Sequence, residues 1–313
     1  MTQSTSIPTF LLFGANGQLG HVLHSVLSSQ GRVVACSRSQ LDLSIANGLQ
    51  ARIEQIVAQA KPEVIINAAA YTAVDKAESE SDIAMLINAT VPGWMAEAAA
   101  RHAAVVVHYS TDYVFRGDRD SAYVETDEVG PLSVYGKTKL AGERAVAAAC
   151  PRHLIFRTSW VFGAHGANFL KTMLRLAHER DDLSVVADQF GAPTSTSLIA
   201  ETTAHVLSQM THAPASDPRW GVYHLVAAGQ TNWHEYAAYV IERARQAGAP
   251  IRLRPDALSS ITTQDYPSPA PRPHNSRMNT SKLRQTFGVH MPDWHVGVDQ
   301  VLAQILKGDG CVS

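Results

Sequence analysis

Residues 9 to 20 read Thr9-Phe-Leu-Leu-Phe-Gly14-Ala-Asn-Gly17-Gln-Leu-Gly20. The apolar run predicts a short buried strand, and the apolar residues from Leu19 to Leu27 have the spacing of a helix. A strand, a glycine turn and a helix together favour dinucleotide binding, because glycine backbones can approach a pyrophosphate at the helix N-terminus. The glycines are spaced Gly-x-x-Gly-x-x-Gly, which departs from the commoner Gly-x-Gly-x-x-Gly. The predicted cofactor loop comprises Gly14, Asn16, Gly17, Gln18, Leu19 and Gly20.

Strand and helix patterns continue to alternate through the first half of the chain. Further strands are predicted at residues 32–37, 63–70, 103–109 and 153–157, and a long helix at 81–100 with a kink at Pro92. Such alternation predicts an α/β fold, a Rossmann-type doubly wound parallel sheet with a smaller C-terminal α/β substrate lobe. We expect residues 1–160 to form the dinucleotide-binding domain, with some later segments crossing back, and residues 161–313 mainly the substrate-binding lobe.

Ligands of such sheets bind beyond the carboxyl ends of the strands. Small residues at the end of the third strand, which would let a cofactor come close, are Ala68, Ala69 and Ala70. The second strand ends Cys36-Ser37-Arg38, without the carboxylate that would bind a ribose hydroxyl and favour NAD. Arg38 can pair with a 2′-phosphate, which favours NADPH and leaves NADH possible; the alternative is an exposed arginine beside a loop. We expect Asp42 and Leu43 to border the adenine.

The fourth strand leads to a tyrosine and a lysine four residues apart, in Tyr135-Gly-Lys-Thr-Lys139. On a helix this spacing places both side chains on one face. A nearby ammonium lowers the pKa of a phenol, which suits the tyrosine to proton transfer. The alternative is an ordinary surface pair, and the surrounding strand ends favour the catalytic interpretation.

Composition excludes several other classes of protein. The net charge is −2, which predicts no nucleic-acid or membrane partner. The 3 cysteines and 14 histidines lack the spacing of a disulfide framework or a metal site. Without a long apolar run or a signal-peptide pattern, we expect a cytoplasmic protein.

Several longer runs narrow the function. They are Asn67-Ala-Ala-Ala-Tyr-Thr-Ala-Val-Asp-Lys-Ala-Glu78, Ser110-Thr-Asp-Tyr-Val-Phe115, Tyr135-Gly-Lys-Thr-Lys-Leu-Ala-Gly-Glu143, Arg157-Thr-Ser-Trp-Val-Phe-Gly163, Asp188-Gln-Phe-Gly-Ala-Pro-Thr194 and Arg272-Pro-His-Asn-Ser276. With these runs the chain resembles the extended short-chain dehydrogenase/reductases, and within them the dTDP-4-dehydrorhamnose reductase family. The resemblance covers nearly the whole chain.

This resemblance implies an NAD(P)H-dependent reduction of the C4 keto group of dTDP-4-dehydro-6-deoxy-L-mannose to dTDP-L-rhamnose, for cell-surface polysaccharide synthesis. It implies that Tyr135 is the catalytic acid, that Lys139 holds the nicotinamide ribose and that Thr111 hydrogen-bonds the keto oxygen. It also places Tyr109 at the cofactor. The substrate-binding residues that it implies are Thr111, Asp112, Trp160, Asn168 and Arg272, the last beside the diphosphate.

Some of these residues have simpler interpretations. Thr111 can be a strand-end hydroxyl that caps a turn, Trp160 an aromatic plug in the core, and Arg272 an exposed arginine between prolines. Alternative functions are another nucleotide-sugar reductase or epimerase, or a non-catalytic NADP-binding regulatory subunit like the beta subunit of methionine adenosyltransferase. Some relatives dimerise through magnesium held by a glutamate where this chain has Val22. We therefore expect no metal there, and a monomer or weak homodimer.

Overall fold

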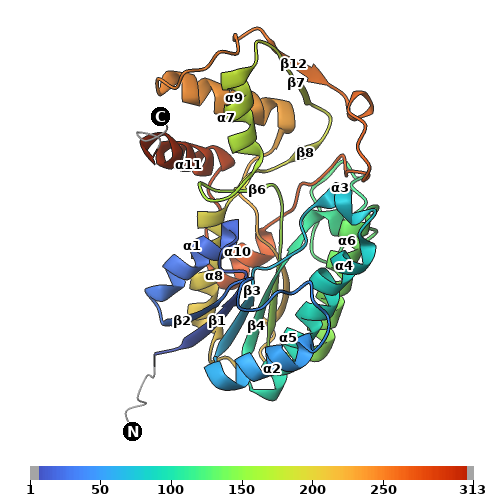
Figure 1. The fold of residues 1–313 in the computed structure, drawn as a ribbon, viewed down its shortest axis with the longest axis vertical. Coiled ribbons are helices and arrows are strands. Elements are labelled where there is room, and N and C mark those ends of the chain that lie inside the picture. Colours follow the sequence, from blue (N-terminus) through green and yellow to red (C-terminus); the bar gives the residue numbers. More distant parts are fainter. Residues whose placement is uncertain (1–6, 309–313) are drawn as a thin grey trace.

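A parallel six-stranded sheet forms the centre of the larger lobe (Figure 1). The computed structural model describes residues 7–308. The strands lie in the order β10-β5-β4-β3-β1-β2, and every neighbouring pair is parallel. Their bounds are β1 Thr9–Phe13, β2 Arg32–Cys36, β3 Val64–Asn67, β4 Val105–Thr111, β5 His153–Thr158 and β10 Gly221–His224. The predicted α/β fold with a parallel sheet is confirmed.

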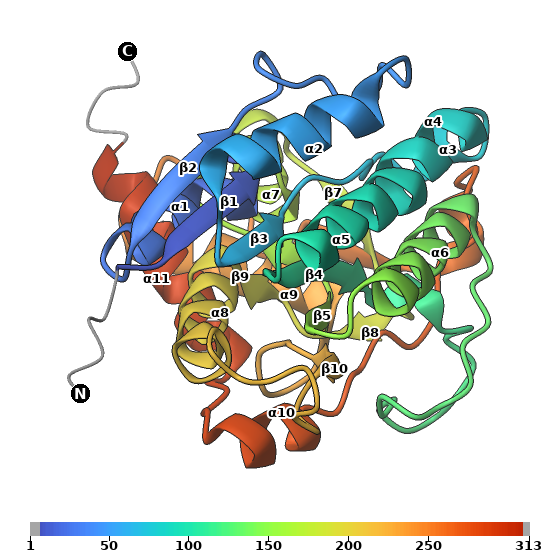
Figure 2. The same ribbon diagram turned by 90° about the horizontal axis from the view of Figure 1, so that it is seen from below.

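Helices cover both faces of this sheet (Figure 2). Side chains alternate along a strand, so Leu11 and Phe13 lie in one apolar core and Phe10 and Leu12 in the other. The first core is closed by α2 Leu49–Ala60, α5 Val91–Arg101 and α6 Val134–Ala149. The second core is closed by α1 Gln18–Ser28, α8 Thr196–Met210 and α10 Ser281–Phe287. Both faces are thus buried, as a parallel sheet requires.

The structure has no simple proline kink at Pro92; the helix is instead irregular just before it. The helical stretch divides into α4 Ser81–Met85, a π-helical turn Leu86–Thr90 and α5, and Pro92 lies in the first turn of α5. Proline has no N–H for the carbonyl of Asn88, and a wider turn before it accommodates the loss. That carbonyl faces Gly142 of α6, where a Cβ would approach its oxygen to 2.0 Å. The irregularity therefore precedes the proline and brings α6 close.

The second half of the chain builds a smaller lobe and also returns to the sheet. The lobe packs a third apolar core around α7 Phe169–Glu179, α9 Trp233–Gln246 and α11 Trp294–Gly308 (Figure 1). Its short strands are β6 Val161–Phe162, β7 Leu183–Val186, β8 Phe190–Gly191, β9 Thr194–Ser195, β11 Thr231–Asn232 and β12 Leu258–Ile261. Meanwhile β10 pairs with β5, and α8 packs on α1. The division at residue 160 stays a prediction. Within residues 7–308, no helix has the length and apolar character needed to cross a membrane.

Candidate active site

The glycine loop brings three parts of the chain into close contact. Gly14 has a φ of +79°, and a Cβ there would lie 2.7 Å from the main-chain nitrogen of Ala69. A Cβ at Gly20 would lie 2.0 Å from the carbonyl oxygen of Gly14. Glycine is therefore required for β1, α1 and the chain after β3 to meet. The N-cap of α1 is Gly17, which has no side chain to bond the first-turn N–H groups, so this helix end suits a pyrophosphate.

A cavity of about 460 Å³ opens beside this loop. Six of the predicted cofactor residues line it: Gly14, Arg38, Asp42, Leu43, Ala69 and Ala70. The lining also includes residues outside the predicted cofactor set, among them Ser37, Ser44, Tyr71 and Lys76. A glycine cradle, an open helix N-terminus and a cavity at the ends of β1 and β2 together fit a dinucleotide. Asn16, Gly17, Gln18, Leu19 and Gly20 form the loop and the start of α1, and Ala68 packs on Gly14.

Arg38 stands at the mouth of this cavity. Its side chain is 80% exposed and pairs with Asp42 at 3.4 Å. Two hydrogen bonds from Ser44 hold the Asp42 carboxylate and, together with Arg38, lower the pKa of Asp42. The guanidinium thus keeps most of its donors accessible to an anion. This arrangement supports the predicted preference for a phosphorylated ribose.

Thr111, Tyr135 and Lys139 come together at the carboxyl end of β4. Thr111 is the last residue of that strand, and Ser133 caps α6 so that Tyr135 lies in its first turn. The Tyr135 side chain is partly buried, and its phenol lies beside the Thr111 hydroxyl. Lys139, one turn later, is 2% exposed and its Nζ donates to the carbonyl oxygen of Tyr109 at 2.6 Å. The three predicted catalytic residues therefore share one buried corner.

The sequence predicted that Lys139 lowers the pKa of Tyr135, and the structure shows the opposite direction. Burial, and secondly the charge of Asp112, raise the pKa of Tyr135, against the hydrogen bond from Thr111. Lys139 does not offset this rise, because its ammonium is directed to the main-chain carbonyl of Tyr109. Burial also lowers the pKa of Lys139 to about 8, partly offset by Glu143. Tyr135 is consequently a neutral phenol at pH 7, the form that an acid needs to donate a proton.

Tyr109 reaches this corner only through its main chain. Its phenol lies in the core and is hydrogen-bonded to Thr203 at 2.8 Å. The predicted cofactor role of Tyr109 is thereby confined to the carbonyl that accepts from Lys139. Tyrosine was expected at a strand end on the ligand side, but strand alternation turns this side chain toward α8.

Two groups that sequence reasoning passed over support the catalytic helix. Glu143 and Arg157 form a buried pair with N–O distances of 2.9 and 2.7 Å, joining α6 to β5 below Lys139. Asn88, fully buried in the π-helical turn, bonds the main chain of Tyr71 and the hydroxyl of Thr138. A polar residue four positions before a proline, inside an apolar helical run, was the available signal for Asn88.

Asp112 is the second titratable group beside Tyr135. It is 3% exposed, and its Oδ1 accepts from the Thr111 hydroxyl at 2.9 Å. Burial raises the pKa of Asp112 to about 6, although hydrogen bonds from Ser276 and Thr111 lower it. Its Oδ2 has no hydrogen-bond partner within residues 7–308. An unpaired buried carboxylate oxygen beside the catalytic phenol suits a sugar hydroxyl.

Trp160 and Asn168 lie where the chain enters the smaller lobe, directly before β6 and α7. Trp160 has a φ of +48°, and its ring stacks on Trp233 with centroids 3.6 Å apart. A non-glycine residue in this conformation is strained, and such strain is commonest at functional sites. Asn168 caps α7 and donates to Gln18 Oε1 at 3.0 Å. It bridges the two lobes, and its contact with substrate stays a prediction.

Arg272 reaches the catalytic wall from the smaller lobe. It pairs with Asp75 at 2.8 Å, and a second nitrogen lies 3.4 Å from the Tyr113 hydroxyl. The Tyr113 ring packs edge-on against Tyr135, with centroids 5.5 Å apart. The interpretation as a merely exposed arginine is wrong, because its side chain is only 27% exposed.

Val22 and the cysteines are the remaining residues about which the sequence made a prediction. Val22 is partly buried against the core that α1 closes. Residues 7–308 contain no group of three or more His, Cys, Asp or Glu side chains that could hold a metal ion. Cys36 and Cys150 are buried thiols, whereas Cys311 lies outside the described residues.

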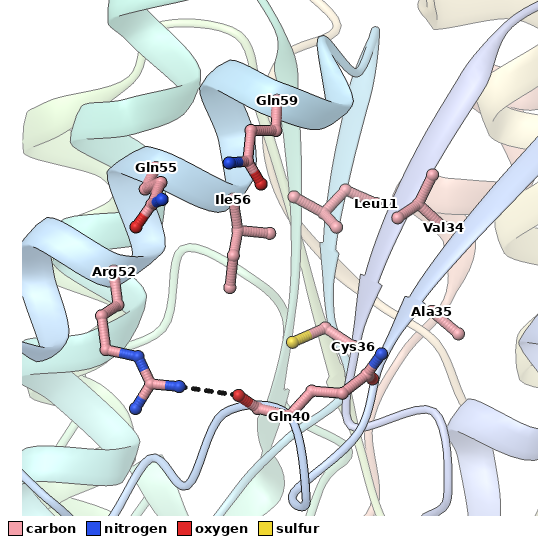
Figure 3. Close-up of a pocket in the computed structure, with 9 residues that line it drawn as sticks. All are labelled: Leu11, Val34, Ala35, Cys36, Gln40, Arg52, Gln55, Ile56 and Gln59. Carbon is pink, nitrogen blue, oxygen red and sulfur yellow. Dashed lines mark hydrogen bonds between the residues drawn. The ribbon is translucent and has the colours of Figure 1, made fainter.

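A second cavity, of about 290 Å³, lies between β2 and α2 (Figure 3). Its rim carries Gln40, Arg52, Gln55 and Gln59, and Arg52 donates to the carbonyl oxygen of Gln40 at 2.8 Å. Cys36 is shared with the larger cavity. Six of the predicted cofactor residues line the larger cavity and none lines this one, so we place the cofactor at the larger cavity. The predicted catalytic residues line neither cavity and lie at the corner around Tyr135.

Comparison with known proteins gives a consistent result. The family model of the RmlD substrate binding domain matches residues 9–307. A dTDP-4-dehydrorhamnose reductase of Shigella flexneri is 50% identical over 94% of this chain and 97% of its own length. One of Burkholderia thailandensis is 45% identical, covering 95% and 99% of the two chains. The crystal structure of dTDP-4-dehydrorhamnose reductase from Bacillus anthracis in complex with NADP superposes with a TM-score of 0.84 at 33% identity, covering 95% and 99% of the two chains.

Proposed function

Because this chain belongs to the RmlD substrate binding domain family of dTDP-4-dehydrorhamnose reductases, we propose that it reduces dTDP-4-dehydrorhamnose to dTDP-L-rhamnose with NADPH. The reaction adds a hydride to C4 of the keto sugar and a proton to the C4 oxygen. The observation that carries the proposal is the corner at the end of β4, where the Tyr135 phenol lies beside the Thr111 hydroxyl and the buried Lys139 ammonium bonds the carbonyl of Tyr109.

The cofactor residues are those of the glycine loop and the larger cavity. The first turn of α1 would bind the pyrophosphate, and Arg38 a 2′-phosphate. When bound, NADPH supplies the hydride. Lys139, held by the Tyr109 carbonyl, would fix the nicotinamide ribose through its remaining N–H groups. Burial near β4 keeps water away from the reacting atoms.

Tyr135 supplies the proton. The Thr111 hydroxyl, which donates to Asp112 in this structure, would turn to the C4 oxygen and polarise the carbonyl by a hydrogen bond that strengthens as negative charge develops there. The phenol, neutral because its pKa is raised, then donates its proton to that oxygen. The Tyr135 phenolate that remains regains a proton from solvent before the next turnover. Asp112 and Trp160 would orient the sugar ring.

Replacing the catalytic phenol tests the proposal. Tyr135→Phe should lower kcat at least ~100-fold, the usual size of acid–base catalysis, and leave NADPH affinity within about twofold. The assay follows NADPH absorbance with dTDP-4-keto-6-deoxy-L-lyxo-hexulose made in situ by upstream enzymes. Tyr239→Phe, which removes a phenol bonded to Asp299 in the smaller lobe, is the matched control. Near-normal turnover by Tyr135→Phe would refute the assignment.

We also propose that the protein acts as a monomer or weak homodimer. Val22, partly buried against the core, supplies no ligand for a hard cation, whereas a metal-bridged dimer needs carboxylates at that position. A mass that rises with added magnesium in sedimentation would contradict this.

A further inference from the structure

The segment of residues 262–279, which we term the strap, crosses from the smaller lobe to the catalytic wall. It is rich in proline, serine and threonine, a composition that also occurs in disordered linkers. Here hydrogen bonds hold it at several places along its length. Thr263 bonds the Asp188 carboxylate through its main-chain N–H and its hydroxyl, at 2.6 to 3.0 Å. Near its middle it is held by Asp75.

Asp75 lies on the short helix α3 Val74–Ala77, beside residues that line the cofactor cavity. One carboxylate oxygen accepts from Arg272 at 2.8 Å, and the other accepts the main-chain N–H of Ala270 at 3.3 Å. One carboxylate thus holds both the backbone and the guanidinium of the strap.

The guanidinium is only partly used by these contacts. Arginine offers five N–H donors in a fixed plane, and the structure pairs two of its nitrogen atoms, one with Asp75 and one with Tyr113. The side chains of Arg272 and Asp75 are 27% and 42% exposed, so this pair adds little stability. Its consequence is orientation, because fixing one edge of a planar guanidinium fixes the direction of the other donors.

The guanidinium nitrogen that contacts Tyr113 adjoins the catalytic corner. Tyr113, which Arg272 contacts, packs against the ring of Tyr135. Burial, with the charge of Asp112, raises the pKa of Tyr113 to about 12, so it meets Arg272 as a neutral phenol. An anion that extends from the reacting sugar along this wall would meet the unused donors of Arg272.

We propose that Asp75 is a positioning residue that orients Arg272 to bind the diphosphate of the nucleotide sugar. The inference rests on the proposed function for the identity of the sugar nucleotide. It assigns to Asp75 a role in substrate affinity and none in the proton or hydride steps. Loss of its charge should therefore weaken diphosphate binding and leave the chemistry at Tyr135 intact.

Direct binding of dTDP, measured by calorimetry on the intact protein with NADPH present, tests this. Asp75→Asn should raise the Kd of dTDP about tenfold, as expected for a weakened charged hydrogen bond, and leave the Kd of thymidine within about twofold. The KM of the keto sugar should rise in parallel, with kcat within about threefold. Asp75→Glu, which keeps the charge, should recover most of the dTDP affinity. Asp82→Asn, the same change at an exposed position on α4, is the matched control.

The double variant Asp75→Asn/Arg272→Ala distinguishes orientation from an independent effect. If Asp75 acts through Arg272, adding Asp75→Asn to Arg272→Ala should change the Kd of dTDP less than twofold. An unchanged or lower Kd in Asp75→Asn alone, or a full additional loss in the double variant, would overturn the inference. These outcomes differ from failure of the proposed function, in which the unaltered protein would not oxidise NADPH with the keto sugar, whatever its affinity for dTDP.

Discussion

Asp112 and Tyr135 show how burial sets the charge of individual residues in this corner. The charge of Asp112 raises the pKa of Tyr135, and burial raises the pKa of Asp112 itself to about 6. Both shifts favour the protonated, uncharged form of the side chain concerned. A carboxylate kept in this position destabilises the fold at neutral pH, a cost that enzymes often bear in their active sites.

The pH dependence of stability follows from the sign of the Asp112 shift. An unfolded aspartate has a pKa of about 3.9, so between about pH 4 and pH 6 the folded chain holds a proton that the unfolded chain has lost. Stability from this group is complete below pH 4 and is lost as pH rises through about 6. Asp112→Asn should therefore raise the free energy of unfolding by about 1 to 3 kcal/mol at pH 8 and by much less at pH 5. Urea unfolding at both pH values checks this, with Asp82→Asn as control; an equal change at both would contradict it.

The stability of α6 depends on its close contact with the π-helical turn. A Cβ at Gly142 would lie 2.0 Å from the carbonyl oxygen of Asn88, a backbone atom with little room to move. Alanine is normally the better helix former by about 1 kcal/mol. Gly142→Ala should nevertheless lower the melting temperature by roughly 2 to 5 °C, because overpacking costs about 1 to 3 kcal/mol. Gly297→Ala on α11, whose Cβ would meet the side chains of Ser195 at 3.2 Å and Phe162 at 3.6 Å, should shift it by less than about 1 °C. Similar shifts for both would argue against the close contact.

The elements also show what the sequence could predict. Apolar periodicity located the strands and most helices of the sheet, and the glycine spacing located the cofactor loop, because both depend on local sequence. The π-helical turn before Pro92 depends on how α5 meets α6, and no local pattern carries that information. The direction of the Tyr109 side chain and the raised pKa of Tyr135 likewise depend on burial by distant segments. The spacing of Tyr135 and Lys139 on one helix turn was predictable from local sequence, whereas the role of Thr111 was implied only by the family resemblance.

At the scale of the whole molecule, the sheet is completed from both halves of the chain. The core under α1 includes Ile199 and Leu207 from α8, Tyr223 from β10 and Phe287 from α10. Each of these residues lies beyond residue 160. The substrate lobe in turn reaches the glycine loop through the bond between Asn168 and Gln18. A cofactor domain that ended at residue 160 would therefore lack α8, β10 and α10, which close one of its two apolar cores.

A fragment of residues 1–160 should consequently fail to fold as a unit. Without α8, β10 and α10, one apolar face of the sheet and the edge of β5 would be exposed, and such surfaces associate or stay loosely packed. The fragment should bind a hydrophobic dye, lack near-ultraviolet circular dichroism and show no measurable NADPH affinity, in contrast to the full chain under the same conditions. A fragment 1–291, which restores α8, β10 and α10 but omits α11, is the more informative comparison, because it keeps the sheet covered on both faces. If the fragment 1–160 binds NADPH with near-normal affinity, the late segments add only to substrate recognition, and the interdependence of the two halves is wrong.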